Sequence, residues 1–207
     1  MTFALEKYNL KETLIYQCFF LRNARNPARS GLNVKKIVLS LIVENTSGVL
    51  SRVAGLFSRR GYNIDSLTVG VTENPKLSRM TVVARGDSGI LEQIRNQLQK
   101  LEDVREITEL APEHSVCREL VLVRVRADGS NRKEVMALTD IFRAKIVDVA
   151  PDSVLIELTG NQAKIDAFIK LLSDFNVLEF VRTGITGLSR GASAEDDFEN
   201  TTHQGEE

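Results

Sequence analysis

Apolar residues recur along the chain with two alternating periodicities, one typical of strands and the other of helices. An unbroken apolar run predicts a strand over residues 36–43, and apolar positions three and four apart then predict a helix over 48–60. The side chains expected on the inward face of this helix are Val49, Leu50, Val53, Leu56 and Phe57. Gly61 follows where a left-handed residue is needed to end a helix. The chain therefore opens with a strand-helix pair.

Two more strands and a second helix complete a first unit. Residues 63–71 and 77–85 are predicted as strands joined by a turn around Pro75, a residue that suits a turn and not a strand interior. Asp87 is a typical cap for the helix that follows. The inward residues expected on that helix are Ile90, Leu91, Ile94, Leu98 and Leu101. A strand at 104–110 closes the unit in the order βαββαβ.

The same order then recurs. The predicted elements are a strand at 119–127, a helix at 131–143, a hairpin around Pro151, a helix at 161–173 and a strand at 177–187. The expected inward residues are Val135, Leu138, Phe142, Ile165, Phe168, Ile169 and Leu172. This order predicts an α+β protein made of two ferredoxin-like βαββαβ sandwiches. Units of about 75 residues expose sheet edges that favour pairing, so a homodimer is expected.

The expected domain boundaries follow from this pattern and from the distribution of charge. The predicted parts are an unstructured extension (1–35), a first domain (36–110), a linker (111–116), a second domain (117–191) and an acidic, unstructured tail (192–207). Net charge is −1, yet residues 1–36 hold seven Lys/Arg against two Glu, and residues 191–207 hold six acids and no Lys/Arg. The rest of the chain is neutral and gives no electrostatic reason to expect nucleic acid or a membrane surface.

The N-terminal extension admits two interpretations. The apolar segment 14–21, between basic residues, weakly resembles a targeting segment, but it is far shorter than the roughly 20 residues that cross a bilayer. Alternatively, the native chain begins near Val34, which the intact mass of the natural protein would test. Cys18 and Cys117 lie in different segments, which disfavours a disulfide and fits a reducing cytoplasm.

The loop between the first strand and the first helix carries the candidate chemistry. Asn45 and Gly48 stand at a helix N-terminus, where free backbone N–H groups and the positive end of the helix dipole favour a carboxylate. Gly48 has no side chain to keep a ligand from the main chain. The amide of Asn45 can accept from an ammonium group and donate to a carboxylate, the two ends of an α-amino acid. Asn63 supplies a second amide near the sheet edge.

A purely structural role is the alternative for each residue alone, because asparagine is common in turns and can bridge backbone groups. The second unit provides an internal comparison. Its loop reads Asp-Gly-Ser-Asn at 128–131, and Lys145 stands at the position of Asn63. Since the second unit keeps neither asparagine, the fold does not require them. An amino-acid site confined to the first unit is therefore the sharper hypothesis.

Several ordered motifs resemble one known family. The stretch ENTSGVLSRVAGLFSRRGYNIDSLTV, with LSRMT, ITEL and GITGLSRG after it, closely resembles the regulatory small subunit of acetolactate synthase, also called acetohydroxyacid synthase. The match covers about residues 35–191. The resemblance implies an N-terminal ACT domain, a C-terminal ACT-like domain and a cytoplasmic, non-catalytic dimer. Such a dimer raises the activity of a separate catalytic subunit in valine, leucine and isoleucine biosynthesis. It also confers feedback inhibition by valine or a related amino acid, with valine the first candidate.

The resemblance also implies a site and a set of cofactors. The effector site of the family lies at the ACT dimer interface. One subunit contributes an asparagine amide and nearby main-chain groups, and the other subunit contributes a second asparagine amide. The corresponding positions here are Asn45, Gly48, Val49 and Leu50, and across the interface Asn63 and Ile64. No cofactor is expected in this subunit; thiamine diphosphate, magnesium and FAD are expected in the catalytic partner. Valine and leucine differ by one methylene, about 0.8 kcal/mol when buried, so the sequence does not choose between them.

Three other classes of function are disfavoured. A free-standing enzyme lacks a nucleophile–base pair or a metal cluster in this sequence. An RNA-binding domain shares the βαββαβ order but needs aromatic residues on its central strands, and 37–43 and 77–85 contain none. A transcription regulator needs a helix-turn-helix, for which residues 1–34 are too irregular. The surface that meets a catalytic subunit and the stoichiometry stay open.

Overall fold

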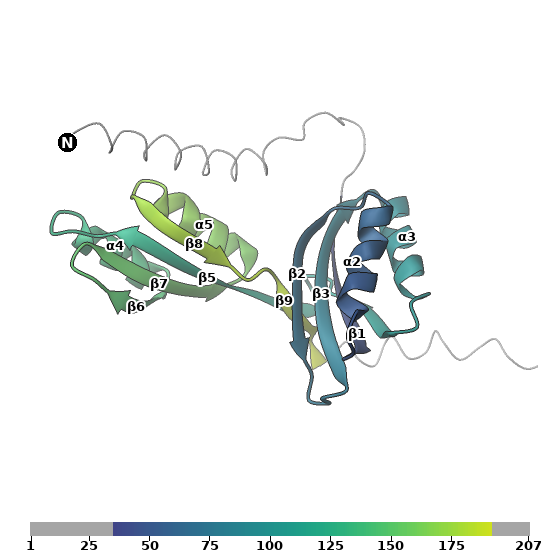
Figure 1. Ribbon diagram of the computed structural model, residues 1–207. Coiled ribbons are helices and arrows are strands. Elements are labelled where there is room, and N and C mark those ends of the chain that lie inside the picture. Colours follow the sequence, from purple (N-terminus) through teal and green to yellow (C-terminus); the bar gives the residue numbers. More distant parts are fainter. Residues whose placement is uncertain (1–34, 192–207) are drawn as a thin grey trace, which may run out of the picture. The chain divides into compact units, whose positions relative to one another are not determined.

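The first half of the chain forms a four-stranded antiparallel sheet with two helices on one face (Figure 1). A computed structural model describes residues 35–191. The elements are β1 (Lys35–Glu44), α2 (Val49–Arg59), β2 (Ile64–Val71), β3 (Leu77–Gly86), α3 (Ser88–Leu98) and β4 (Val104–Glu109). The strand order β2-β3-β1-β4 is that of a ferredoxin-like sandwich, with β2 at one edge. The predicted βαββαβ order is confirmed.

The second half repeats the architecture. Its elements are β5 (Ser115–Arg126), α4 (Arg132–Ile141), β6 (Lys145–Val149), β7 (Ser153–Gly160), α5 (Gln162–Leu172), β8 (Val177–Arg182) and β9 (Thr186–Ser189). Four of its strands run in the order β6-β7-β5-β8, which matches the first sheet position by position. The α+β class with two βαββαβ units is therefore confirmed.

The end of the second unit differs from the prediction. The single strand expected over 177–187 is two strands, β8 and β9, because the chain turns at Gly184, whose φ is 90°. After this turn, β9 pairs antiparallel with residues 115–118, the first part of β5. That pairing extends β5 back into the segment expected as a linker, 111–116. The long strand β5 thus pairs with β9 at its start and with β7 and β8 further along.

The core of the first sheet follows from strand alternation. Every second residue of β1 faces the helices, and so do alternate residues of β3. The strand residues in this core are Ile37, Leu39, Leu41, Val43, Met80, Val82 and Ala84. Leu50 is a correction: it was expected inward, but 45% of its surface is exposed. The buried stripe of α2 runs through Val49, Val53, Leu56 and Phe57, and Leu50 lies about 100° around the helix from Val49.

The first helix of each unit ends in the same way. A left-handed residue follows the helix, Gly61 (φ 68°) in one unit and Arg143 (φ 51°) in the other. The N–H of that residue and the next N–H donate back to helix carbonyls, at 3.2 and 3.0 Å in the first unit and at 3.0 and 2.9 Å in the second. This is a Schellman motif. Asn63 and Lys145 each follow the left-handed residue by two positions, so the structure confirms that they correspond.

The predicted extension before Lys35 and the tail 192–207 lie outside the described residues, so the expectations about them stay predictions. Within residues 35–191, no helix is long and apolar enough to cross a membrane. In the same range, no group of three or more His, Cys, Asp or Glu side chains is arranged to hold a metal ion.

Candidate functional site

The start of α2 is open to a ligand. Gly48 is its N-cap residue, with φ 87° and ψ −13°, and no side chain caps the helix. The first hydrogen bond of the helix runs from the N–H of Arg52 to Gly48 O, at 2.9 Å. The N–H groups of the first turn that precede Arg52 therefore have no acceptor within the helix. The first turn also holds no acidic residue. The positive end of the helix is therefore not offset by an acidic residue of its own first turn.

Arg52 adds a cation at this point. A Cβ placed on Gly48 would lie 3.0 Å from Arg52 Nη1, so the guanidinium group lies directly beside the glycine. Asp103 holds it there, accepting from Nε at 2.5 Å and from Nη2 at 2.8 Å. The hydrogen bond from Arg52 lowers the pKa of the Asp103 carboxyl below its usual value. Arg52 was not among the residues predicted for the site; its spacing of four from Gly48 was the available signal.

Asn45 is partly committed to the protein. Its backbone N–H donates to Lys76 O at 2.7 Å, and its Nδ2 donates to Pro75 O at 2.9 Å. Both bonds fasten the loop to the β2–β3 turn. An asparagine amide carries two N–H donors and one carbonyl acceptor, so Oδ1 and one N–H stay available on this exposed side chain. The predicted acceptance from an ammonium group uses Oδ1 and is compatible with this geometry.

Asn63 immediately precedes β2 and is exposed. Its Nδ2 donates to Asp65 Oδ1 at 3.0 Å, and Asp65 in turn forms an ion pair with Arg85 of β3. The β2–β3 register shifts between Ile64 and Ser66, at the position of this aspartate. Sequence reasoning missed Asp65 and Arg85, because a register shift leaves no local signal. Asn63 keeps its Oδ1 and one N–H for other partners.

One copy of the chain does not bring the two asparagines together. Asn45 lies before α2 and Asn63 after it, so the length of the helix separates them. From Gly48 to Tyr62 the rise is about 20 Å at 1.5 Å per residue, much longer than a free amino acid. A ligand that touches both amides must therefore receive one of them from a second copy. The edge strand β2, with Val69 48% and Val71 63% exposed, offers a surface for such a partner.

The matching loop of the second unit is closed by its own side chains. Asn131 Oδ1 accepts from the N–H of Asp128 at 3.0 Å, and Asp128 Oδ1 accepts from the N–H of Ser130 at 2.9 Å. Arg132 donates to three backbone carbonyls, including that of Pro151, at 2.6–2.8 Å. Hydrogen bonds from Ser130 lower the pKa of Asp128, so this carboxylate stays charged and repels an anion. Neither helix start is capped by a side chain, but the loop before α4 is filled by hydrogen bonds from its own side chains and the loop before α2 is not.

Comparisons with known proteins agree with this architecture. A family described as the small subunit of acetolactate synthase matches residues 118–191, and one described as an AHAS small subunit-like ACT domain matches 39–106. The chain belongs to the acetolactate synthase small subunit family. It is 51% identical over 156 residues to the probable acetolactate synthase small subunit of Methanothermobacter thermautotrophicus, covering 75% of this chain and 93% of that relative. It is 50% identical to the acetolactate synthase isozyme 3 small subunit of Escherichia coli, covering 74% and 95%.

A solved structure supports the family assignment. The crystal structure of the acetolactate synthase small subunit from Thermotoga maritima superposes with a TM-score of 0.71 at 43% identity, covering 75% of this chain and 98% of that one. The resemblance drawn from the sequence motifs is thereby confirmed. All six candidate site residues lie inside the range matched by the ACT domain.

Proposed function

We propose that this chain is the regulatory subunit of an acetolactate synthase. In this role it binds a separate catalytic subunit, raises its activity and confers feedback inhibition by valine or a related branched-chain amino acid. Family membership supports the regulatory role. The observation that carries the effector site is the open loop before α2, which lacks the side-chain hydrogen bonds that fill the matching loop of the second unit.

The open loop offers a complement to each end of an amino acid. Its carboxylate is placed against the first-turn N–H groups at Gly48, Val49 and Leu50, with Arg52 beside them. Its ammonium group is placed at Asn45 Oδ1. Hydrogen bonds to charged groups contribute about 1.5–3 kcal/mol each, so these polar contacts supply most of the affinity. The exposed side chain of Leu50 is available to the aliphatic side chain of the effector.

A homodimer completes the site. In a two-fold dimer each copy contributes the same surface, so the Asn45 end of one chain and the Asn63 end of its partner form one site, and the reverse pair forms another. Ile64, half-buried at the start of β2, lies next to Asn63 and is placed to contact the effector side chain. Two equal sites per dimer result.

Inhibition then follows from linkage. An effector held between two copies stabilises one arrangement of the dimer, and the catalytic subunit binds another arrangement better. The coupling free energy between inhibitor and catalytic subunit equals the difference in effector binding free energy between the two arrangements of the dimer, typically about 1–3 kcal/mol. Thiamine diphosphate, magnesium and FAD are assigned to the catalytic partner, and the subunit itself is assigned to the cytoplasm.

The test is to separate inhibition from activation. Asn45→Ala removes the ammonium acceptor, and Gly48→Asp sets a negative charge against the carboxylate; both are expected to abolish valine inhibition of the reconstituted enzyme while activation is kept. Asp128→Ala, at the matching loop of the second unit, is the control and should leave inhibition unchanged. Unaltered valine affinity of the first two variants in titration calorimetry would refute the site. The purified chain with pyruvate and thiamine diphosphate should form no acetolactate.

A further inference from the structure

A hollow lies on the face of the first sheet that α2 and α3 leave uncovered. Its volume is 350 Å³. Gly70 of β2 and Arg79 of β3 stand opposite each other and line it, and Thr186 and Leu188 line it from β9. Met80, the neighbour of Arg79, belongs to the core under the helices, so Arg79 points to the other face. A Cβ on Gly70 would meet no atom within 4 Å, so the missing side chain leaves the hollow open.

The wall that β9 forms is fastened to β2. The N–H of Ile185 donates to Ser66 Oγ at 3.0 Å, and Thr68 Oγ1 donates to Ile185 O at 2.9 Å. Ile185 is buried, and Gly184 before it leaves no room for a Cβ between its backbone and Ser66 Oγ. The chain thus lies directly against β2 at this point, and the hollow is a preformed feature of the fold.

Arg79 brings a positive charge into the hollow that the protein does not neutralise. A guanidinium group has five N–H donors, and here Nη1 donates to Ser40 Oγ at 2.7 Å, a neutral acceptor. Within residues 35–191 Arg79 takes part in no ion pair, whereas Arg85, on the same face of β3, pairs with Asp65. Arg79 is half-buried. Its other donors are therefore available to a carboxylate, which arginine binds through two parallel hydrogen bonds.

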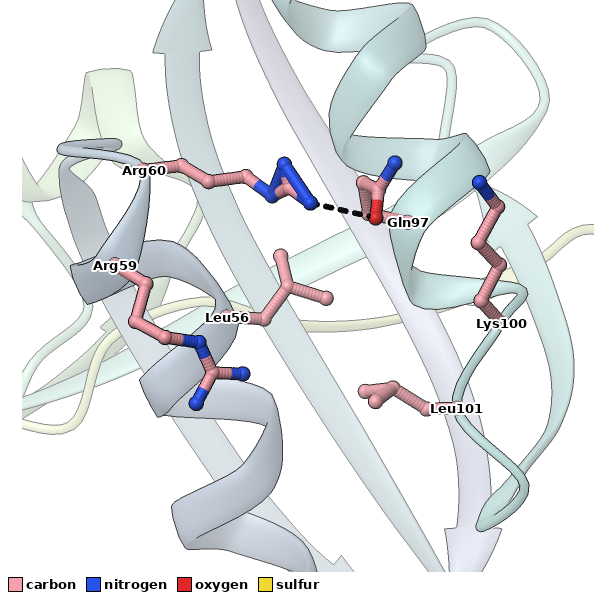
Figure 2. Close-up of a pocket in the computed structure, with 6 residues that line it drawn as sticks. All are labelled: Leu56, Arg59, Arg60, Gln97, Lys100 and Leu101. Atoms are coloured by element: carbon pink, nitrogen blue, oxygen red, sulfur yellow. Dashed lines mark hydrogen bonds between the residues drawn. The ribbon is translucent and has the colours of Figure 1, made fainter.

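A second hollow, between the C-terminal ends of α2 and α3, provides a contrast (Figure 2). Arg59 and Arg60 line it from the end of α2, and Lys100 lines it from beyond α3. All three are exposed, and cations are favoured at helix C-termini because the helix dipole places partial negative charge there. The helices therefore account for these charges. Arg60 still resembles Arg79 in its bonding, since its Nη2 donates to a neutral acceptor, Gln97 Oε1, at 2.8 Å.

The charges around the first hollow favour a protein surface over a free anion. Glu73, an exposed residue on the turn between β2 and β3, also lines this hollow, and within the described residues it forms no ion pair. A free anion attracted by Arg79 is repelled by Glu73. A protein surface can place a carboxylate on Arg79 and a hydrogen-bond donor on Glu73 at the same time. Leu188, 56% exposed, adds apolar surface next to both.

We propose that the catalytic subunit docks in this hollow, with one of its carboxylate side chains on Arg79 and an apolar side chain over Gly70 and Leu188. The inference rests on the proposed function, which supplies a protein partner but does not say which surface meets it. Arginines that fill a desolvated pocket are enriched among the few interface residues that contribute most of the binding energy.

The turn between β2 and β3 connects this surface to the effector loop. Glu73 of the turn lines the hollow, and the carbonyls of Pro75 and Lys76 accept from Asn45 Nδ2 and from the Asn45 N–H, at 2.9 and 2.7 Å. A movement of Asn45 on effector binding is thus passed to one wall of the docking surface. The two sites remain separate, because neither Asn45 nor Asn63 lines the hollow.

The test measures assembly of the reconstituted enzyme. Catalytic subunit at a fixed concentration is titrated with this chain, and the rise in acetolactate formation gives an apparent Kd. Arg79→Met should raise this Kd at least about tenfold, because it removes one partner of an interfacial charge pair. Valine affinity in calorimetry and the dimer in analytical ultracentrifugation should stay as in the wild type. Arg60→Met is the matched control and should titrate as the wild type does.

Gly70→Ile tests the hollow without changing its charge. Gly70 does not have a positive φ, and a β-branched residue suits a strand better than glycine, so the fold should be kept. The added side chain occupies the hollow and should weaken assembly as Arg79→Met does. Thermal unfolding of the free chain establishes that each variant is folded.

The outcomes separate this inference from the proposed function. An unchanged Kd for Arg79→Met or for Gly70→Ile overturns the docking surface, and an equal loss in Arg60→Met overturns it by showing a response to net charge alone. If Arg79→Met dissociates into monomers, the hollow belongs to the interface between copies, which also overturns it. In each case the wild-type chain still raises the activity of the catalytic subunit, and the proposed function stands. If the wild-type chain does not raise the activity, the proposed function fails and this inference fails with it.

Discussion

The left-handed conformation of Gly48 allows the candidate site to be tested with a matched pair of substitutions. Gly48 has φ 87° and Gly61 has φ 68°, at the two ends of the same helix. An alanine in the left-handed region costs about 1–2 kcal/mol. A Cβ at Gly61 meets no atom within 4 Å, and a Cβ at Gly48 meets the flexible end of Arg52 at 3.0 Å. Gly48→Ala and Gly61→Ala should therefore destabilise the protein by similar amounts.

Their effects on valine binding should differ. The methyl group of Gly48→Ala meets Arg52 Nη1 at 3.0 Å and so pushes the guanidinium away from the proposed carboxylate position, whereas a methyl group at Gly61, at the other end of α2, meets no atom within 4 Å. Loss of one hydrogen bond to a charged group, about 1.5–3 kcal/mol, weakens valine binding roughly 10- to 150-fold. Gly61→Ala should keep the wild-type affinity.

Titration calorimetry with valine, together with thermal unfolding of the same samples, measures both quantities. Each variant is expected to lose about 2–8 °C in Tm, from a cost of about 1–2 kcal/mol and about 2–4 °C per kcal/mol for a chain of this length. If Gly48→Ala binds valine as tightly as Gly61→Ala, the helix start is not the carboxylate site. Equal loss of affinity in both variants would attribute the effect to stability and would also contradict the site.

Three further predictions concern stability and assembly. Glu119 is 5% exposed and accepts two hydrogen bonds from Arg182, at 2.5 and 2.7 Å. Arg182→Met leaves this buried carboxylate without its partner and should lower the free energy of unfolding in urea by about 3 kcal/mol. A loss no larger than that of an ordinary surface substitution would contradict this. The hydrogen bond from Arg52 lowers the pKa of the Asp103 carboxyl in the folded protein. The pair therefore stabilises the fold at pH above the pKa of an unfolded Asp, about 3.9, and this stabilisation is lost as the pH falls through the lower pKa of the folded state. The stability difference between wild type and Asp103→Asn should shrink on acidification, and a constant difference would refute this. Val71→Lys, on the exposed edge strand β2, should shift the dimer toward monomer in analytical ultracentrifugation, and an unchanged dimer would move the interface elsewhere.

The order of elements could be predicted because apolar periodicity is a local property. The buried set on α5, Ile165, Phe168, Ile169 and Leu172, matches the expected inward face residue by residue. Asp87 caps α3 as expected, accepting from the N–H of Ile90 at 2.9 Å. The split of the last strand was not predictable, because β9 is defined by its pairing with a segment about seventy residues earlier.

The candidate site was predictable in part. A glycine before a helix marks an open N-terminus, and the structure gives Gly48 that position. Which amide donors are already used could not be read from the sequence, because Pro75 and Asp65 reach the asparagines through the tertiary fold. The cation beside the helix start was missed for the same reason, since Arg52 is held in place by Asp103 from beyond α3. Local patterns thus pointed to the start of α2 as a candidate site, and long-range contacts determine which polar groups it offers.

Sharing of one effector between two copies is the central claim, and complementation between variants tests it most directly. Asn45→Ala and Asn63→Ala homodimers, each unable to bind valine, are mixed and allowed to exchange subunits. In half of the resulting dimers one site receives both intact asparagines, so about a quarter of the wild-type valine sites should return in titration calorimetry. If no binding returns although subunit exchange is complete, the two asparagines do not meet across an interface and the account is contradicted.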